Sequence, residues 1–258
     1  MKRLVITFLF VLSLTTLACA EDAASAYVPG PEKLNYKVMY KWGLISKQAG
    51  TVKIYTHSFD NGWFSSTLIG QSASWADKFY SVRDTLRCTI MADKLEPTYY
   101  EKIAREGGDY KRDVINYTRW RDEVTGFCQR WRQKKKSDTE TYSHITIKGT
   151  GVTLDMLSSY YYMRHIDYPN MKKGDTVTTN VFSGKKKEIL NIIYLGQKSI
   201  EIDGKDHLCY YIKFTFTGDN GKQSSDDMYA WISTDSNRIP LMLLGNLPIG
   251  SIRCYYMP

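Results

Sequence analysis

Short stretches in which apolar and polar residues alternate recur along this chain, and they limit its fold more than any other feature. The stretch 34–42 places Leu34, Tyr36 and Val38 on one side of an extended backbone, which is the period-two pattern of a half-buried strand. Two-residue turn sequences such as Asn-Gly and Asp-Gly separate these stretches, and they accept the positive φ angles of tight hairpins. We therefore predict a mainly β fold, a large antiparallel meander that twists and rolls into a half-open barrel to bury one face.

Two stretches break the strand pattern. Residues 74–80 fit one or two helical turns, and Thr153–His165 fits a longer helix that begins with its N-cap residue. Leu157 and Tyr161 share one face of that helix at a spacing of four residues. Because a single helix cannot bury such a stripe alone, we expect it to pack on the concave face of the sheet. Residues 34–258 then form a single β domain.

The N-terminus has the pattern of a secretory signal peptide, two cations followed by a short apolar run and a small-residue cleavage site. We expect residues 1–20 to be removed and residues 21–33 to form a flexible leader. An alternative is an imperfect lipobox in which Cys19 is acylated. We expect an exported protein, located in the periplasm or associated with the outer membrane, and we favour soluble export over the lipid anchor at Cys19.

The formal net charge is +8, so the surface could meet anionic lipid head groups, glycans or nucleic acid. Export argues against nucleic acid. The densest basic runs are 130–136 and Lys185-Lys186-Lys187. Such runs are mostly solvated loop tips, and that interpretation is favoured over binding of lipid phosphates or acidic glycans.

Four cysteines follow Cys19, an even number that allows up to two disulfides in an oxidising compartment. Their spacing is too wide for a zinc-binding pair. Free, buried thiols that act as small hydrophobes are an equal alternative, and the sequence does not choose a pairing. The four are Cys88, Cys128, Cys209 and Cys254.

No group of residues has the spacing of a catalytic, cofactor-binding or metal-binding site. Gly70–Ser74 misses the nucleophile-elbow pattern at its last position. Asp226 and Asp227 are adjacent in an expected strand and point to opposite faces, so they cannot both act on one glycosidic bond. The histidines form none of the usual zinc motifs. We expect a protein that is not an enzyme and has no cofactor, and we interpret Asp235 as structural.

One aromatic group is the best candidate for ligand contact. If the helix lies in the barrel, these side chains either plug it or line a cavity for an acyl chain or similar apolar ligand. The group is Trp75, Phe79, Leu157, Tyr160, Tyr161 and Met163.

Four segments resemble a family of exported bacterial proteins that carry the domain of unknown function numbered 3108. They are Leu34-x-Tyr36 with Tyr40-x-Trp42-Gly43, Phe79-Tyr80-x-Val82-x-Asp84, Tyr160-Tyr161-Tyr162-Met163-Arg164, and Trp231–Asp235 with Arg238-Ile239-Pro240. The resemblance implies a half-open barrel with a helix against its hollow, similar to the YmcC-like half-barrel and more distantly to periplasmic lipoprotein carriers. It implies no catalytic residues.

Three hypotheses for function follow. The first is a non-catalytic binder of an apolar or amphiphilic envelope component such as a lipid, a hypothesis that rests on fold analogy. The second is a structural or assembly protein that binds envelope proteins or glycan through a sheet edge and basic loops. The third, least favoured, is an enzyme on envelope polysaccharide. A monomer is the default oligomeric state.

Overall fold

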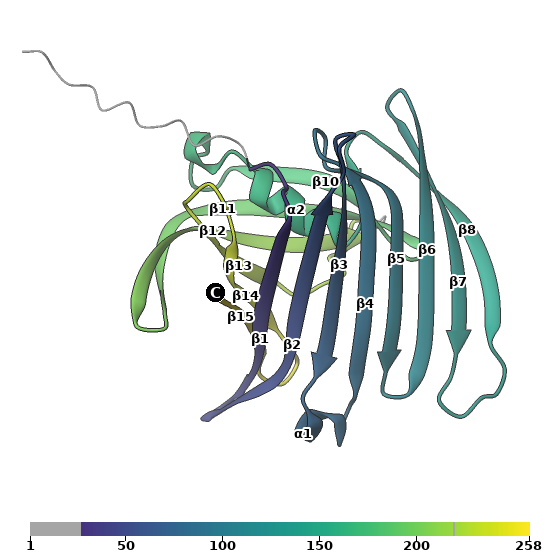
Figure 1. Cartoon of the computed structure of the whole chain (residues 1–258), viewed down its shortest axis with the longest axis horizontal. Helices are drawn as coiled ribbons and strands as arrows, with labels where there is room; N and C mark the ends of the chain where they lie inside the picture. Colours follow the sequence, from purple (N-terminus) through teal and green to yellow (C-terminus); the bar gives the residue numbers. More distant parts are fainter. Residues whose placement is uncertain (1–26, 219) are drawn as a thin grey trace, which may run out of the picture.

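The computed structural model describes residues 27–218 and 220–258. The predicted signal peptide, which includes Cys19, and residues 21–26 of the predicted leader lie outside the described residues. One 15-stranded sheet dominates the molecule (Figure 1). Its first eight strands are β1 (Glu32–Trp42), β2 (Ile45–Ser58), β3 (Trp63–Ser72), β4 (Val82–Met91), β5 (Glu96–Glu106), β6 (Asp109–Trp120), β7 (Glu123–Gln133) and β8 (Thr141–Thr150). The others are β9 (Thr153–Leu154), β10 (Thr176–Ser183), β11 (Lys186–Ile202), β12 (Lys205–Gly218), β13 (Met228–Ser233), β14 (Pro240–Asn246) and β15 (Ser251–Met257).

Sequential neighbours pair antiparallel from β1 to β8 and from β10 to β15, β9 pairs in parallel with β10, and β1 pairs with β15 to join the two halves. The two outermost strands, β8 and β9, lie at opposite ends of the hydrogen-bonded order. The curved sheet brings these ends together, so that β8 contacts β10 and β11 across a seam (Figure 1). The predicted meander rolled into a half-open barrel is confirmed, and the seam is the place where the barrel stays open.

The predicted hairpin turns have the backbone that their residues allow. At the β11–β12 turn Asp203 has φ 50° and Gly204 has φ 76°, two consecutive positive values that match the tight hairpin turn favoured by Asp-Gly. This turn joins strands of 17 and 14 residues, whereas β13 and β14 have only 6 and 7. The β11–β12 hairpin therefore extends beyond the strands next to it.

The two helices lie near where the sequence predicts them. α1 (Ser74–Asp77) is one turn, and α2 (Ser158–His165) is packed inside the barrel (Figure 1). The predicted start of α2 at Thr153 is wrong, because Thr153 and Leu154 pair in parallel with β10. α2 begins at Ser158, and Asp155 caps the turn before it, since its Oδ1 accepts hydrogen bonds from the backbone N–H of Leu157 and Ser158, both 2.7 Å. A 3₁₀ turn, η1 (Tyr168–Asn170), follows.

The disulfide alternative for the cysteines is contradicted. All four cysteines of the described chain are free, and three of them are buried. Cys88 on β4 and Cys128 on β7 are separated by β5 and β6, roughly 14 Å along a sheet. A disulfide needs Cα atoms within about 7 Å. Two strands also separate Cys209 on β12 from Cys254 on β15, so these side chains serve as apolar wall residues.

Within the described part of the chain no helix is long and apolar enough to cross a membrane. Nor does that part contain a group of three or more His, Cys, Asp or Glu residues placed to hold a metal ion.

Candidate functional site

The α2 tyrosines fill the hollow of the barrel. Tyr161 is fully buried, and its hydroxyl shares hydrogen bonds of 2.6 Å with Thr56 Oγ1 on β2 and Ser66 Oγ on β3. The Tyr160 hydroxyl shares one of 2.9 Å with the Tyr36 hydroxyl on β1. Because these polar tips bind the wall, the rings act as a plug, as expected of a close-packed interior.

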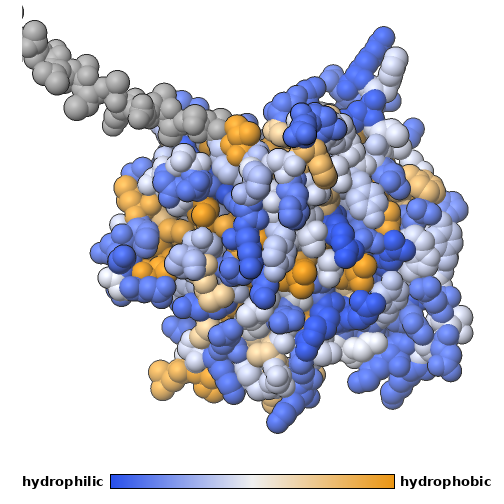
Figure 2. Space-filling view, in the orientation of Figure 1, coloured by the Kyte–Doolittle hydropathy of each residue, from blue (hydrophilic) through white to orange (hydrophobic). Residues whose placement is uncertain are grey.

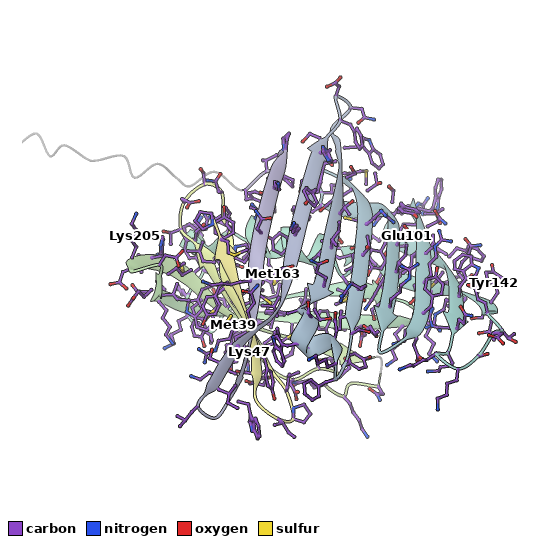
Figure 3. The ribbon with its side chains drawn as sticks, turned by 60° about the horizontal axis from the view of Figure 1, so that its bottom comes forward. Met39, Lys47, Glu101, Tyr142, Met163 and Lys205 are labelled. Atoms are coloured by element: carbon purple, nitrogen blue, oxygen red, sulfur yellow. The ribbon has the colours of Figure 1, made fainter. Side chains whose placement is uncertain are left out.

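The remaining predicted contact residues divide into two groups. Leu157 and Met163 are buried with the tyrosines, and Met163 lies within the ring of strands (Figure 3). Trp75 and Phe79 lie in and just after α1, where they pack edge-on against each other and Phe79 is 83% exposed. The grouping of these two with the concave-face residues is therefore wrong, because α1 belongs to the connection between β3 and β4 and has no buried residue. Contact of the four buried residues with a ligand stays a prediction.

A buried ion pair holds the C-terminal end of α2 in place. The Arg164 side chain is fully buried, and its guanidinium donates to both carboxylate oxygens of Glu32, at 2.5 and 2.9 Å. It also donates to the backbone carbonyls of Arg238 and Asn237. The guanidinium carbon lies 3.9 Å from the centroid of the Tyr27 ring, within cation–π range. Arg164 thus joins α2 to β1 and to the β13–β14 turn.

Asp155 places a carboxyl group next to the N-terminal end of α2. It is completely buried, and this burial raises its pKa to about 7 despite the helix-capping hydrogen bonds and the attraction of Arg119, which lower it. Its Oδ2 has no hydrogen-bond partner among the described residues. A carboxyl group in such a setting favours its neutral form.

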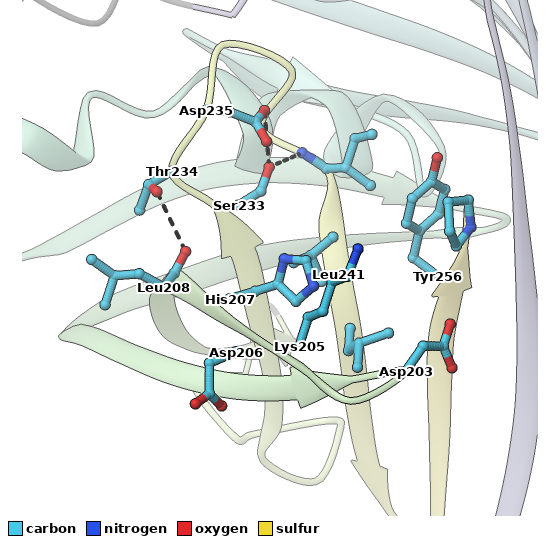
Figure 4. Close-up of a pocket in the computed structure, with 13 residues that line it drawn as sticks. Asp203, Lys205, Asp206, His207, Leu208, Ser233, Thr234, Asp235, Leu241 and Tyr256 are labelled. Atoms are coloured by element: carbon cyan, nitrogen blue, oxygen red, sulfur yellow. Dashed lines mark hydrogen bonds between the residues drawn. The ribbon is translucent and has the colours of Figure 1, made fainter.

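A separate hollow lies beside the overhanging end of the β11–β12 hairpin, and we call it the hairpin pocket (Figure 4). Its volume is about 560 Å³. The apolar side chains that line it come from three places along the chain, the hairpin, β14 with the turn before it, and β15. They are Ile202, Leu208, Ile239, Leu241 and Tyr256. Apolar side chains also gather over this side of the molecule (Figure 2).

Polar residues surround this apolar lining. They are Asp203, Lys205, Asp206, His207, Ser233, Thr234 and Asp235, together with the C-terminal Pro258. Carboxylates outnumber cations among them, and Lys37 approaches Asp203 from β1 at 3.9 Å. The pocket thus combines an apolar floor with a hydrogen-bonding, predominantly acidic rim.

The Ser233 hydroxyl is occupied by the turn that follows β13. It donates to Asp235 Oδ1 at 3.2 Å and accepts from the backbone N–H of Ile239 at 2.9 Å. Asp235 Oδ1 also accepts from the backbone N–H of Asn237. This agrees with the structural interpretation of Asp235.

Sequence reasoning missed the hairpin pocket. Asp203-Gly204 was recognisable as a turn, but the residues around it have no chemical signature. The available signal was strand length, since a long hairpin next to a short strand must extend past it. Only the lysine end of the basic run 130–136 is ordinary surface, where Lys134 Nζ pairs with Asp109 at 2.7 Å and its side chain is 78% exposed. Arg130 and Arg132 of the same run are mostly buried and pair with Asp113.

Comparisons with known proteins agree with this fold. The model of the family described as "Protein of unknown function (DUF3108)" matches residues 35–256. A similar solved structure is the β-barrel-like protein of domain of unknown function DUF1849 from Brucella abortus, with a TM-score of 0.60 and 9% sequence identity. The match covers 90% of this chain and 98% of that one, and at this identity it shows the fold alone. No curated protein matches the sequence.

Proposed function

We propose, on the premise that this chain belongs to the DUF3108 family of proteins of unknown function, that it is an exported, non-catalytic binding protein of the bacterial envelope. In this proposal the hairpin pocket holds the apolar part of an amphiphilic envelope component. The observation that supports it best is the hollow of about 560 Å³ with an apolar floor and a polar rim. Pockets of roughly 300–1,000 Å³ with that character are typical of small-molecule sites.

The floor favours an acyl chain or a similar apolar group over a polar ligand. Leu241 is buried, while Leu208 is 49% exposed at the mouth, so a ligand that enters covers apolar surface that water now contacts. Each buried methylene contributes about 0.8 kcal/mol to binding. The acidic rim would then select a head group that donates hydrogen bonds or is cationic, and would disfavour an anionic one.

The test is binding of N-phenyl-1-naphthylamine, an uncharged apolar fluorophore, by the mature protein and by Leu208→Asp. We expect about tenfold weaker binding by Leu208→Asp, since a carboxylate at the mouth removes apolar contact. Leu247→Asp is the matched control, because Leu247 is similarly exposed, at 43%, and lies outside the pocket. Equal binding by both variants and the wild type would refute the pocket as the site.

Displacement of the fluorophore then identifies the ligand class. Neutral or zwitterionic long-chain lipids should compete, and short-chain analogues with the same head group should not. Export is tested separately by the mass of the mature N-terminus from cell envelopes. Cleavage after Ala20, acylated Cys19 and an intact Met1 give three distinct masses, and only the third contradicts export.

A further inference from the structure

A second hollow, of about 380 Å³, opens where the β10–β11 turn meets the inner wall of β5–β7, and we call it the basic hollow. It lies at the opposite end of β11 from the hairpin pocket, so it does not rest on the function proposed above. Its lining is mainly charged: Tyr100, Lys102, Asp113, Arg130, Met156, Ser183, Gly184, Lys185, Lys186 and Glu188.

The β10–β11 turn is held firmly against the wall. Phe182, fully buried at the end of β10, stacks on Tyr117 of β6 with ring centroids 5.7 Å apart. Gly184 has φ 59°, and a Cβ built on it would lie 3.1 Å from Asp113 Oδ2. Only a residue without a side chain fits there comfortably. This packing brings the next two residues, Lys185 and Lys186, to the rim of the hollow.

The carboxylates of the hollow already have partners. Asp113 accepts hydrogen bonds from the guanidinium groups of Arg130, at 2.9 Å, and Arg132. Glu188 accepts from the hydroxyl groups of Ser183 and Ser224. The two carboxylates are therefore already engaged, and the cations that line the hollow outnumber them.

The lysines supply this surplus. Lys102 points inward from β5 and lies near Asp84 and Glu106, and Glu106 is itself paired with Lys111 at 2.7 Å. Within the described chain, Lys185 and Lys186 have no carboxylate within ion-pair distance. Ammonium groups from two directions, the wall and the turn, therefore face one small space.

A buried hydroxyl at the floor of the hollow also lacks a partner. Tyr100 is 1% exposed and lines the hollow, yet its hydroxyl makes no hydrogen bond to any described residue. Burial raises the pKa of this hydroxyl well above its usual value, so it stays protonated and can donate. Among the charged groups, the Asp155 carboxyl acts on this hydroxyl most strongly, and its own Oδ2 also lacks a partner among the described residues. Because buried polar groups in native proteins are almost always paired, an acceptor oxygen of a group bound in the hollow would complete the hydrogen bonding of Tyr100.

We propose that the basic hollow binds a phosphate group, as a free ester or as part of a lipid head group. A phosphate offers several acceptor oxygens in different directions, which suits one tyrosine hydroxyl and ammonium groups from two elements. Met156, an apolar side chain in the lining that is 39% exposed, leaves room for the organic part of such an ester.

The experiment measures binding of inorganic phosphate and glycerol 3-phosphate by calorimetry, and of phosphatidylglycerol or phosphatidylcholine vesicles by sedimentation. We expect the wild-type protein to bind at least one phosphate probe, with affinity that falls as salt rises. Binding of glycerol 3-phosphate assigns the site to a free ester, whereas binding of phosphatidylglycerol vesicles alone assigns it to a lipid head group. Absence of binding to every probe would overturn the proposal.

Two variants test the contacts. Tyr100→Phe removes only the unpartnered hydroxyl, so the fold should stay intact while affinity falls about tenfold. Lys185→Met with Lys186→Met should weaken binding at least as much. The matched control is Lys172→Met with Lys173→Met, an exposed lysine pair before β10 that removes the same charge elsewhere. Equal losses in the two lysine pairs, or none in Tyr100→Phe, would mean that only net charge matters and would refute the site.

Discussion

Removal of the carboxylate of Glu32 should destabilise the protein strongly, because Arg164 would then be left as a buried charge. Glu32→Gln keeps the size and shape of the side chain but loses its negative charge. Of the two guanidinium–carboxylate hydrogen bonds, at 2.5 and 2.9 Å, one becomes a weaker bond to the amide oxygen. The other is lost, because the amide NH2 is a donor and cannot accept from the guanidinium. The Arg164 side chain is 0% exposed, so water cannot replace the lost partner.

Loss of one partner of a buried ion pair typically costs about 3–5 kcal/mol. Glu32 is 18% exposed, and Arg164 keeps two backbone carbonyl acceptors, so the lower end of that range applies. We expect Glu32→Gln to reduce the free energy of unfolding by about 3 kcal/mol. For a chain of this size that corresponds to a fall in Tm of roughly 6–12 °C.

Urea unfolding followed by circular dichroism measures this change. Asp203→Asn is the control, because Asp203 is 68% exposed and lies 3.9 Å from Lys37, so loss of this surface pair should leave the midpoint unchanged. The double variant Glu32→Gln with Arg164→Met should recover part of the loss, since it removes the stranded charge. A Glu32→Gln midpoint within error of the Asp203→Asn midpoint would refute the reasoning.

Three further predictions follow from the buried groups. Asp155 binds its proton more tightly in the folded state, with a pKa of about 7, than in the unfolded chain. The free energy of unfolding should therefore fall as pH rises from about 4 through 7, by up to about 4 kcal/mol. Urea unfolding of Asp155→Asn should lack this dependence on pH. Tyr161→Phe should cost about 1–3 kcal/mol by leaving two buried wall hydroxyls unpaired; a thermal midpoint equal to wild type would contradict the plug. Alkylation of the denatured mature chain without reductant should modify four cysteines, and mass spectrometry that shows two or none would contradict the free thiols.

The strands and turns could be predicted because their signal is local. Alternation in 34–42 and turn pairs such as Asp203-Gly204 act through the pleat of a strand and the φ angles of two residues. The start of α2 could not be predicted in the same way. Thr153 is a good N-cap in isolation, but pairing with β10 draws it into the sheet, and that contact depends on tertiary structure.

The candidate sites were harder to predict than the fold for a related reason. Tyr160 and Tyr161 were recognisable as residues of the concave face, but whether they plug or line it depends on Thr56, Ser66 and Tyr36, which lie some hundred residues away. The basic run at Lys185 was visible in the sequence. Only the packing of the turn before it against Asp113 shows that it faces a hollow.

Because Asn35 pairs with Met257, β1 and β15, which are more than 200 residues apart along the chain, lie next to each other in the wall. Closing so long a loop is entropically costly, and topologies of this kind fold slowly. In a nascent chain that lacks β15, the backbone N–H and C=O groups on one side of β1 are unpaired, and such an edge can pair with a strand of another chain. The barrel can therefore be completed only once β15 has been made, and until then β1 pairs with β2 alone.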